Sequence, residues 1–262
     1  MSFKDIFNID AEVKESAHAR VNLIGEHTDY TGGYVMPTLL SFKNTIEISQ
    51  NNSNEFTVYS QHFKEKKTFN DFKKSINTEW VDYIKGCLHI FFDENKISSR
   101  FLNIFISSDI PLERGISSSS ALCVATLKAL NTFFETKITN PEIAKLAKKV
   151  EFNYIGVSGG IMDQMVSSIG IHGKAFFMNC KNLEYELINF PENWKFCLID
   201  SEVQRNLRDS SYNERFAELQ EAEKKLGVEY LGEVKKENFQ TNKFDNNTIA
   251  KRAKHVVFEN DR

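Results

Sequence analysis

The hydrophobic spacing of this chain changes at Ser117, and no other feature of the sequence limits its fold as much. Four short segments before this point are rich in β-branched and aromatic side chains, as strands are: residues 19–24, 43–49, 55–60 and 101–107. From Ser117 onward, SSSSALCVATLKALNTFF has apolar residues between Leu122 and Phe134 at nearly helical spacing. A sheet followed by a helix that begins at the serines is therefore expected.

The rest of the chain repeats this alternation. A second helix is predicted with Asn140 as its N-cap and Pro141 as its first residue, and a third, short helix is predicted after Gly160. Strand patterns return in KAFFMN, LEYELINF and KFCLID. An amphipathic helix is expected at about 211–226, and the final segment TIAKRAKHVVFENDR also has helical spacing.

This order of elements, without internal repeats, predicts an α+β fold. We expect two lobes, an N-terminal one over residues 1–170 and a C-terminal one over 171–262. Because the last helical pattern ends without a glycine cap and no strand follows it, the second lobe is expected to be incomplete.

Composition excludes several classes of protein. Of the 262 residues, 41% are hydrophobic and 26% are charged, which is typical of a globular protein. The net charge of -3 provides no basic field for nucleic acid, and no segment is apolar enough to span a membrane. The four cysteines are far apart and the N-terminal segment lacks a secretory pattern, so we expect reduced cysteines and a cytoplasmic location.

The stretch ARVNLIGEHTDYTGGYVMP ends an apolar run in consecutive hydrogen-bonding side chains. Glu26 and Asp29 can each accept hydroxyl hydrogen bonds, Arg20 is a permanent cation, and Gly32 and Gly33 allow close approach of a ligand to the backbone. This set would suit a sugar. A charged β-turn in which Arg20 pairs with a carboxylate explains the same residues.

A second stretch, DIPLERGISSSSALCVAT, places four serines before an apolar helix. The first amides of a helix lack internal partners and lie at the positive end of its dipole, so they can hold a phosphate group. This pattern predicts a phosphate loop without a Walker lysine. Ordinary N-capping by one serine is the alternative.

A third stretch, GVSGGIMDQMVSSIG, places Asp163 after two glycines at the expected start of a helix. A carboxylate at this point could orient or deprotonate an attacking hydroxyl group. An aspartate that stabilises the helix dipole is the alternative.

Taken together and in this order, the three stretches resemble the galactokinase family, a branch of the superfamily that also contains homoserine, mevalonate and phosphomevalonate kinases. RVNLIGEHTDYTGGYVMP is similar to the galactokinase signature almost residue for residue. RGISSSSA resembles the phosphate-binding loop, GGIMDQ the segment with the catalytic aspartate, and LIDSEVQRNLRDSSYNER the segment with a sugar-contacting tyrosine. The resemblance runs from about residue 10 to the end of the chain.

This resemblance implies a two-lobed small-molecule kinase that uses ATP and Mg²⁺ to phosphorylate the anomeric hydroxyl of D-galactose, with the active site between the lobes. It implies Arg20 and Asp163 as the catalytic pair. The implied sugar-binding residues are Glu26, His27, Asp29, Gly160 and Tyr212. The implied residues of the phosphate loop are Gly115, Ser117, Ser118, Ser119 and Ser120, and the implied Mg²⁺ ligands are Ser119 and Glu151. Trp80 and Tyr83 match aromatic residues near the nucleotide, although core packing explains them equally well.

Three features depart from the family pattern. Ala19 replaces a glycine, which we expect to be tolerated if its φ is negative. Glu113 replaces a glycine of the phosphate loop and adds negative charge beside a polyanion. No further glycine-rich motif follows Gly232.

Three alternatives stay open. An N-acetylgalactosamine kinase would share much of the same signature, a ligand-responsive sensor of galactokinase type would share the resemblance, and the missing glycine-rich motif would fit a truncated fragment that retains the other motifs. A monomer is favoured, and neither nucleic acid nor a membrane is an expected partner.

Overall fold

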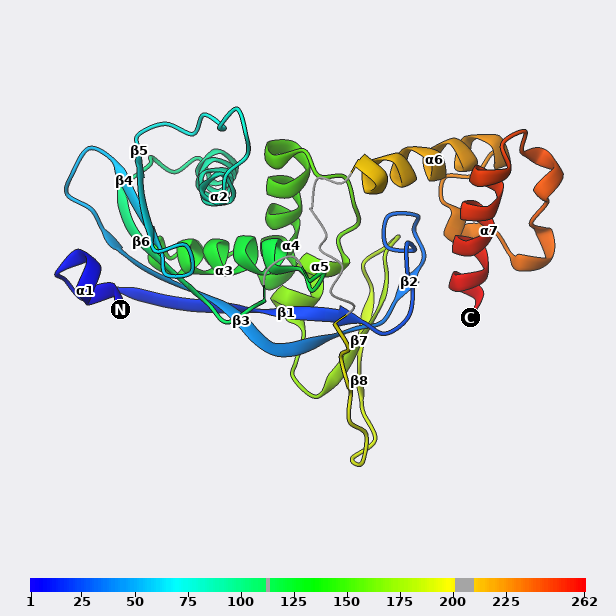
Figure 1. The fold of residues 1–262 in the computed structure, drawn as a ribbon, viewed down its shortest axis with the longest axis horizontal. Helices are drawn as coiled ribbons and strands as arrows, with labels where there is room; N and C mark the ends of the chain where they lie inside the picture. The colour runs from blue at the N-terminus through cyan, green and yellow to red at the C-terminus, as the bar shows by residue number, and fades with distance from the viewer. Residues whose placement is uncertain (112–113, 201–209) are drawn as a thin grey trace.

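The structure, a computed structural model, describes residues 1–111, 114–200 and 210–262, in which a sheet and helices alternate (Figure 1). The strands are β1 (Val13–Asn22), β2 (Tyr34–Val35), β3 (Pro37–Gln50), β4 (Phe56–Ser60), β5 (Glu65–Phe69), β6 (Leu102–Ser108), β7 (Lys174–Asn179) and β8 (Tyr185–Asn189). The helices are α1 (Phe3–Phe7), α2 (Trp80–Asn95), α3 (Ser118–Phe133), α4 (Asn140–Lys149), α5 (Met162–Ile169), α6 (Ser210–Leu226) and α7 (Asn247–Asp261). A π-helical turn, Val150–Ile155, follows α4.

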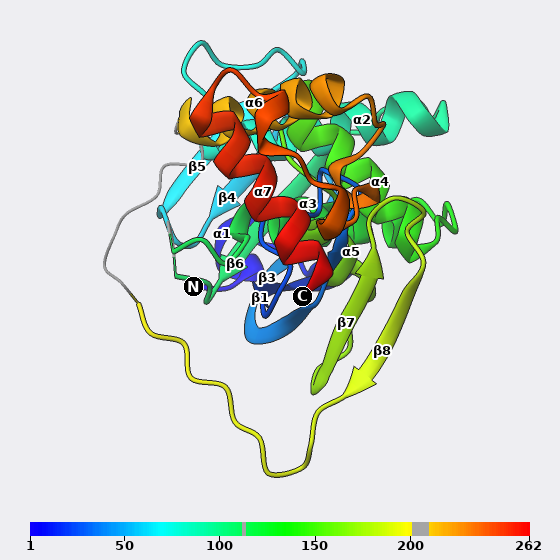
Figure 2. The ribbon, with the colours of Figure 1, turned by 90° about the vertical axis from the view of Figure 1, so that its right-hand side faces the viewer.

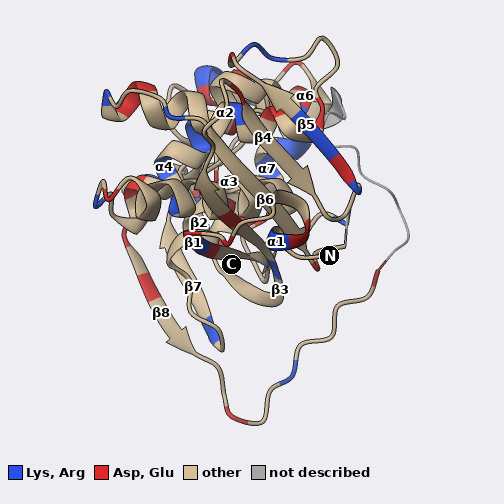
Figure 3. Ribbon diagram, turned by 90° about the vertical axis from the view of Figure 1, so that its left-hand side faces the viewer, with Lys and Arg blue, Asp and Glu red and all other residues tan. Residues whose placement is uncertain are grey.

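The strands of the described residues form one eight-stranded sheet built around β3. Its main path runs β2-β7-β3-β6-β4-β5, with β1 paired to β3 and β8 paired to β7. Strand β4 runs parallel to β6, and the other pairs are antiparallel. At the edge, β5 reads EKKTF, and its charged residues, coloured in Figure 3, are typical of an edge strand.

The main core lies between this sheet and helices α2 to α4. Ile48 of β3 and Ile104 of β6 are register partners and are fully buried with Ile84 of α2 and Leu127 of α3. Helix α3 also packs along β1 and β3, and Figure 1 shows it lying over these strands. Because α3 is held by the core along its length, its N-terminal end has a fixed position.

The later elements form two further apolar clusters. Helix α5 packs against β7 through Val166 and Phe176, both fully buried. Helices α6 and α7 pack together around Leu219 and Val256, at the opposite end of the molecule from α1 (Figure 1). β7 and β8 belong to the same sheet as β1 to β6, so the sheet continues past residue 170. The expected division between two lobes near that residue stays a prediction.

Most of the sequence-based elements are present, with changed bounds. Strand β1 begins six residues before the expected segment 19–24, because residues 13–18 (VKESAH) are mostly polar on a half-exposed strand and give a weaker strand signal. The N-cap of α4 is Thr139 and not Asn140, because Thr139 and Glu142 form a capping box. The helices expected after Ser117, after Gly160 and at 211–226 are confirmed as α3, α5 and α6.

The strand predicted for KFCLID is wrong. Residues 195–200 are exposed and make no ladder with a neighbour in the described part of the chain, so their β propensity has no partner to act on. Figure 2 shows the segment after β8 running as an extended loop away from the body of the molecule. Among the described residues, no helix is both long enough and apolar enough to cross a membrane.

Replacing one isoleucine in the core and one on the surface tests this packing. Ile48 is fully buried, so Ile48→Ala should lower the free energy of unfolding by about 2–5 kcal/mol through the cavity it leaves. Ile76 is fully exposed, so Ile76→Ala should change it by less than about 0.5 kcal/mol. Urea unfolding measures both, and equal losses in the two variants would contradict this core.

Candidate active site

A bidentate ion pair joins the beginning of the chain to its middle. Arg20 lies in β1 just after an irregularity in the register with β3, and Asp163 lies in the first turn of α5. Arg20 Nε donates to Asp163 Oδ1 and Arg20 Nη2 donates to Asp163 Oδ2, each over 2.6 Å. The side chains are 14% and 24% exposed, so the pair is mostly buried but still open to a ligand on one side. Burial lowers the pKa of Arg20, but the charge and hydrogen bonds of Asp163 outweigh it and raise that pKa overall.

The serine-rich loop contacts the same ion pair. Arg20 Nη1 donates to the carbonyl oxygen of Gly115 over 3.1 Å, and the hydroxyl of Ser117 donates to Asp163 Oδ2. Ser117 has a φ of 63°, in the left-handed region that non-glycine residues seldom adopt. The resemblance implies a phosphate contact for Ser117, whereas its hydroxyl here holds the carboxylate of Asp163.

The next two serines converge on one buried carboxylate. Ser119 and Ser120 donate to the two oxygens of Glu151, each over 2.8 Å, and Gln164 donates to the same carboxylate. Glu151 lies in the π-helical turn and is 6% exposed. Burial raises its pKa, while the hydrogen bonds from the two serines and Gln164 favour the ionised form. Gln164 follows Asp163 directly, so this cluster and the ion pair share one helix start.

The residues of the predicted sugar pocket gather around Asp29. A Cβ atom added to Gly160 would lie 2.6 Å from the carbonyl carbon of Asp29, so the two residues pack against each other and only glycine fits. The ring of Tyr212 comes from α6 and lies 6.0 Å from that of His27, centroid to centroid. His27 Nδ1 and the Tyr30 hydroxyl lie 2.8 Å apart and share a hydrogen bond. Glu26, in contrast, is exposed, and its carboxylate accepts from Asn22 over 3.0 Å.

The loop that carries these residues is held by the end of the chain. Glu259 of α7 accepts from the backbone N–H of Gly25 over 2.9 Å, and Asn260 accepts from that of Tyr34 over 2.7 Å. Gly232 donates its backbone N–H to Thr31 over 2.9 Å. Glu259 and Asn260 belong to none of the sequence motifs, because a side-chain oxygen that accepts from distant backbone N–H groups has no local sequence signal.

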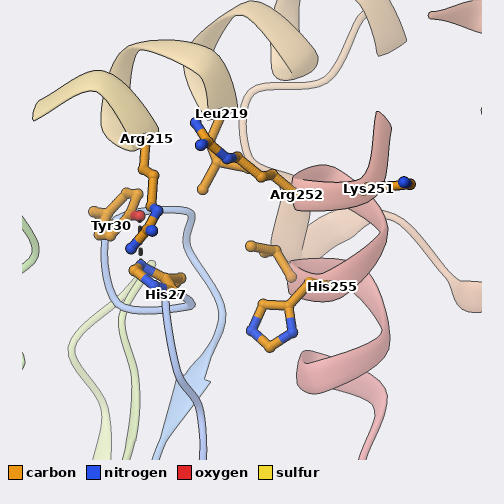
Figure 4. Close-up of a pocket in the computed structure, with 8 residues that line it drawn as sticks. His27, Tyr30, Arg215, Leu219, Lys251, Arg252 and His255 are labelled. Carbon is orange, nitrogen blue, oxygen red and sulfur yellow. Dashed lines mark hydrogen bonds between the residues drawn. The ribbon is translucent and has the colours of Figure 1, made fainter. Parts of the chain in front are cut away.

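A cavity of about 190 Å³ lies beside this loop, between α6 and α7 (Figure 4). Its lining includes His27, Tyr30, Arg215 and His255, but neither Arg20 nor Asp163. Figure 4 shows Arg215 pointing from α6 toward Tyr30 and His27. The cavity therefore adjoins the loop and is separate from the ion pair.

Four residues singled out in the sequence remain, two aromatic residues of α2 and two departures from the family pattern. Trp80 and Tyr83 lie in α2 and pack on the main core, where Trp80 Nε1 donates to Glu65 over 2.8 Å, so their role near a nucleotide stays a prediction. Ala19 is fully buried in β1 and its φ is not positive, as its tolerance requires. Glu113 lies outside the described residues, so its effect on the phosphate loop stays a prediction.

Two family models and a solved structure define the class of this protein. Residues 82–170 match the family model for the GHMP kinases N terminal domain, and residues 1–50 match the galactokinase galactose-binding signature. The mevalonate kinase of Methanococcus jannaschii has the same fold, with a TM-score of 0.61 at 20% identity. Together with the serine-rich start of α3, these matches define a small-molecule kinase of the GHMP class.

Closer relatives supply the family. A galactokinase of Thermotoga petrophila is 36% identical over 251 residues, which are 95% of this chain and 69% of the relative. The crystal structure of Lactococcus lactis galactokinase complexed with galactose matches with a TM-score of 0.88 at 31% identity, covering 99% of this chain and 70% of that one. The chain belongs to the galactokinase family.

Two adjacent glycines provide a matched test of the contact between Gly160 and Asp29. Gly160→Ala should force Asp29 away, with a loss of about 1–3 kcal/mol in the free energy of unfolding and weaker binding of sugar. Gly159→Ala should be tolerated, because its added Cβ would meet Tyr212 no closer than 3.5 Å. Thermal melting with and without galactose compares them, and a harmless Gly160→Ala would contradict this packing.

The ionisation of Asp29 predicts a pH dependence of stability. Burial and then the charge of Asp163 raise the pKa of Asp29 to about 7, against about 4 in an unfolded chain. Between these values the folded state binds the extra proton, so the free energy of unfolding should fall as the pH rises from about 4 to about 7. Asp29→Asn removes this fall, which is worth at most about 4 kcal/mol.

Urea unfolding of both proteins without ligand, at pH 5 and pH 8, measures the difference. Parallel behaviour of the wild type and Asp29→Asn over this range would show that Asp29 is not buried as described.

Proposed function

We propose that this chain transfers the γ-phosphoryl group of ATP to the anomeric hydroxyl of D-galactose, giving galactose 1-phosphate and ADP. The observation that carries the proposal is the ion pair between Arg20 and Asp163, placed between the serine-rich start of α3 and the loop with Asp29. The galactose-binding signature over residues 1–50 and the relatives named galactokinase support galactose as the acceptor.

In this proposal Asp163 positions and polarises the attacking hydroxyl. Arg20 holds both oxygens of the carboxylate, and Ser117 donates to one of them, so the orientation of Asp163 is set before the substrate arrives. Phosphoryl transfer needs little covalent chemistry from the protein, and positioning with charge stabilisation provides most of the acceleration. The guanidinium of Arg20 supplies positive charge next to the transferring group.

The sugar would lie against Asp29, Gly160 and Tyr212, with Glu26 and His27 at its rim. Asp29 offers acceptor oxygens for hydroxyl groups, and the aromatic face of Tyr212 offers an apolar contact for the sugar ring. Gly160 leaves room for Asp29 and for the sugar alike. The clamp from Glu259 and Asn260 keeps this loop in place.

ATP would bind with its phosphates at the N-terminus of α3, at the loop from Gly115 to Ser120. The first backbone amides of α3 and the positive end of its dipole would favour an anion. Trp80 and Tyr83 of α2 would lie on the nucleotide side.

The residues present fit a magnesium ion. Ser119 and Glu151 offer a hydroxyl and a carboxylate oxygen that lie together, and Mg²⁺ commonly takes one or two protein oxygens beside phosphate and water. When bound, Mg²⁺ would offset charge on the phosphate oxygens. Ser120 and Gln164 orient the Glu151 carboxylate for this purpose.

The role of Asp163 is tested by Asp163→Asn. The variant keeps the shape of the side chain but loses the charge, so galactose-dependent ADP formation should fall by at least about 100-fold. A coupled ADP assay with galactose and a panel of other hexoses, including N-acetylgalactosamine, measures both rate and acceptor choice.

Asp93→Asn serves as the control, because Asp93 is exposed on α2. It should retain wild-type turnover, and melting curves should show both variants folded. Undiminished turnover in Asp163→Asn would refute the assigned role.

A further inference from the structure

Lys148 is a partly buried cation that lies outside the three sequence motifs. It lies near the end of α4, where its Nζ donates to the carbonyl oxygen of Gly159. The same ammonium group lies 5.4 Å from the centre of the Phe152 ring, a cation–π contact that fixes its direction. A Cβ on Gly159 would lie 4.0 Å from this Nζ and 3.6 Å from the Tyr212 hydroxyl. Lys148 therefore adjoins the sugar side of the candidate site.

Three carboxylates of the site act on this lysine. Burial lowers the pKa of Lys148, while the charges of Glu151, Asp29 and Asp163 oppose that effect in this order. In return, the charge of Lys148 opposes the raised pKa of Asp29, and its effect is larger than that of Arg20. Lys148 is thus a second cation for a site that Arg20 alone would leave with excess negative charge.

The backbone contact gives Lys148 a second effect. Gly159 precedes Gly160, whose backbone packs directly on Asp29. By holding the carbonyl of Gly159, Lys148 sets the path of this double glycine and so the space beside Asp29. One side chain thereby determines both the position and the charge of the acceptor.

We propose that Lys148 is a positioning residue of the sugar site, which holds the Gly159–Gly160 backbone and keeps Asp29 available as a hydroxyl acceptor. This inference rests on the proposed function. It predicts that binding of galactose depends on Lys148 most strongly at low pH, where Asp29 needs a nearby cation to ionise.

Several titratable groups face Asp29, and each of them can affect the pH dependence of galactose binding. They come from β1, the loop after it, α4, α5, the end of β7 and α6: Arg20, Tyr30, Lys148, Asp163, Cys180 and Tyr212. Burial raises the pKa of each of the two tyrosines and of Cys180, and the charge of Asp29 adds to it, so these three stay neutral between pH 6 and pH 8.5. Asp29, whose pKa is raised to about 7, changes its charge within this window.

The test measures galactose affinity by titration calorimetry without ATP at pH 6, 7 and 8.5. Removing the cation with Lys148→Met should raise the pKa of Asp29 by about one unit, which weakens galactose binding about ninefold at pH 6 and about fivefold at pH 7. The loss should shrink at pH 8.5. Lys148→Arg, which keeps the charge, should restore most of the wild-type pH profile.

Lys149→Met is the matched control, because Lys149 is the next residue and pairs with Glu94 over 2.7 Å on the surface. It should bind galactose with the wild-type pH profile. A folded Lys148→Met with wild-type affinity at every pH, or with the same loss at every pH, would overturn the inference. Failure of the wild-type chain to bind galactose would instead overturn the proposed function.

Discussion

The contact between Arg20 and Asp163 is the interaction on which the rest of the site depends. The two residues are 143 positions apart, and both oxygens of the carboxylate are held by one guanidinium. The remaining nitrogen of Arg20 reaches the Gly115 carbonyl, so the same side chain also sets the serine-rich loop. Removing either partner would leave a mostly buried charge uncompensated. The resulting loss of stability would exceed the net stability that the intact pair contributes. The pair therefore couples β1, α5 and the start of α3.

Charge balance explains how so many carboxylates can lie together. Asp29, Asp163 and Glu151 influence one another through space, and burial raises the pKa of Asp29 and of Glu151. Arg20, Lys148 and the positive end of α3 oppose this accumulation of negative charge. Under the proposed function, such a site would be organised in advance to accept hydroxyl hydrogen bonds on one side and a phosphate group on the other.

The sheet and α7 together hold the loop of residues 23–33, which follows β1. Strand β3 pairs with β1, β6 and β7, so the loop after β1 emerges from the best-connected part of the sheet. Glu259 and Asn260 then secure its backbone from α7. His27 has a φ of 67° within this loop, a conformation that such external contacts can maintain.

The sequence by itself determined the alternation of elements, the three motifs and the family they resemble, because periodicity and short motifs are local properties. The helix predicted after Ser117 is confirmed. The resemblance implied Arg20 and Asp163 as a catalytic pair; the two side chains are in contact, and their catalytic role stays a prediction. Only the tertiary structure decided that Ser117 holds Asp163, that Lys148 holds the carbonyl of Gly159, and that Glu259 holds the backbone of Gly25. It also showed that KFCLID forms no strand. These outcomes depend on which distant segments meet and on what is buried between them, and one-dimensional patterns carry no such information.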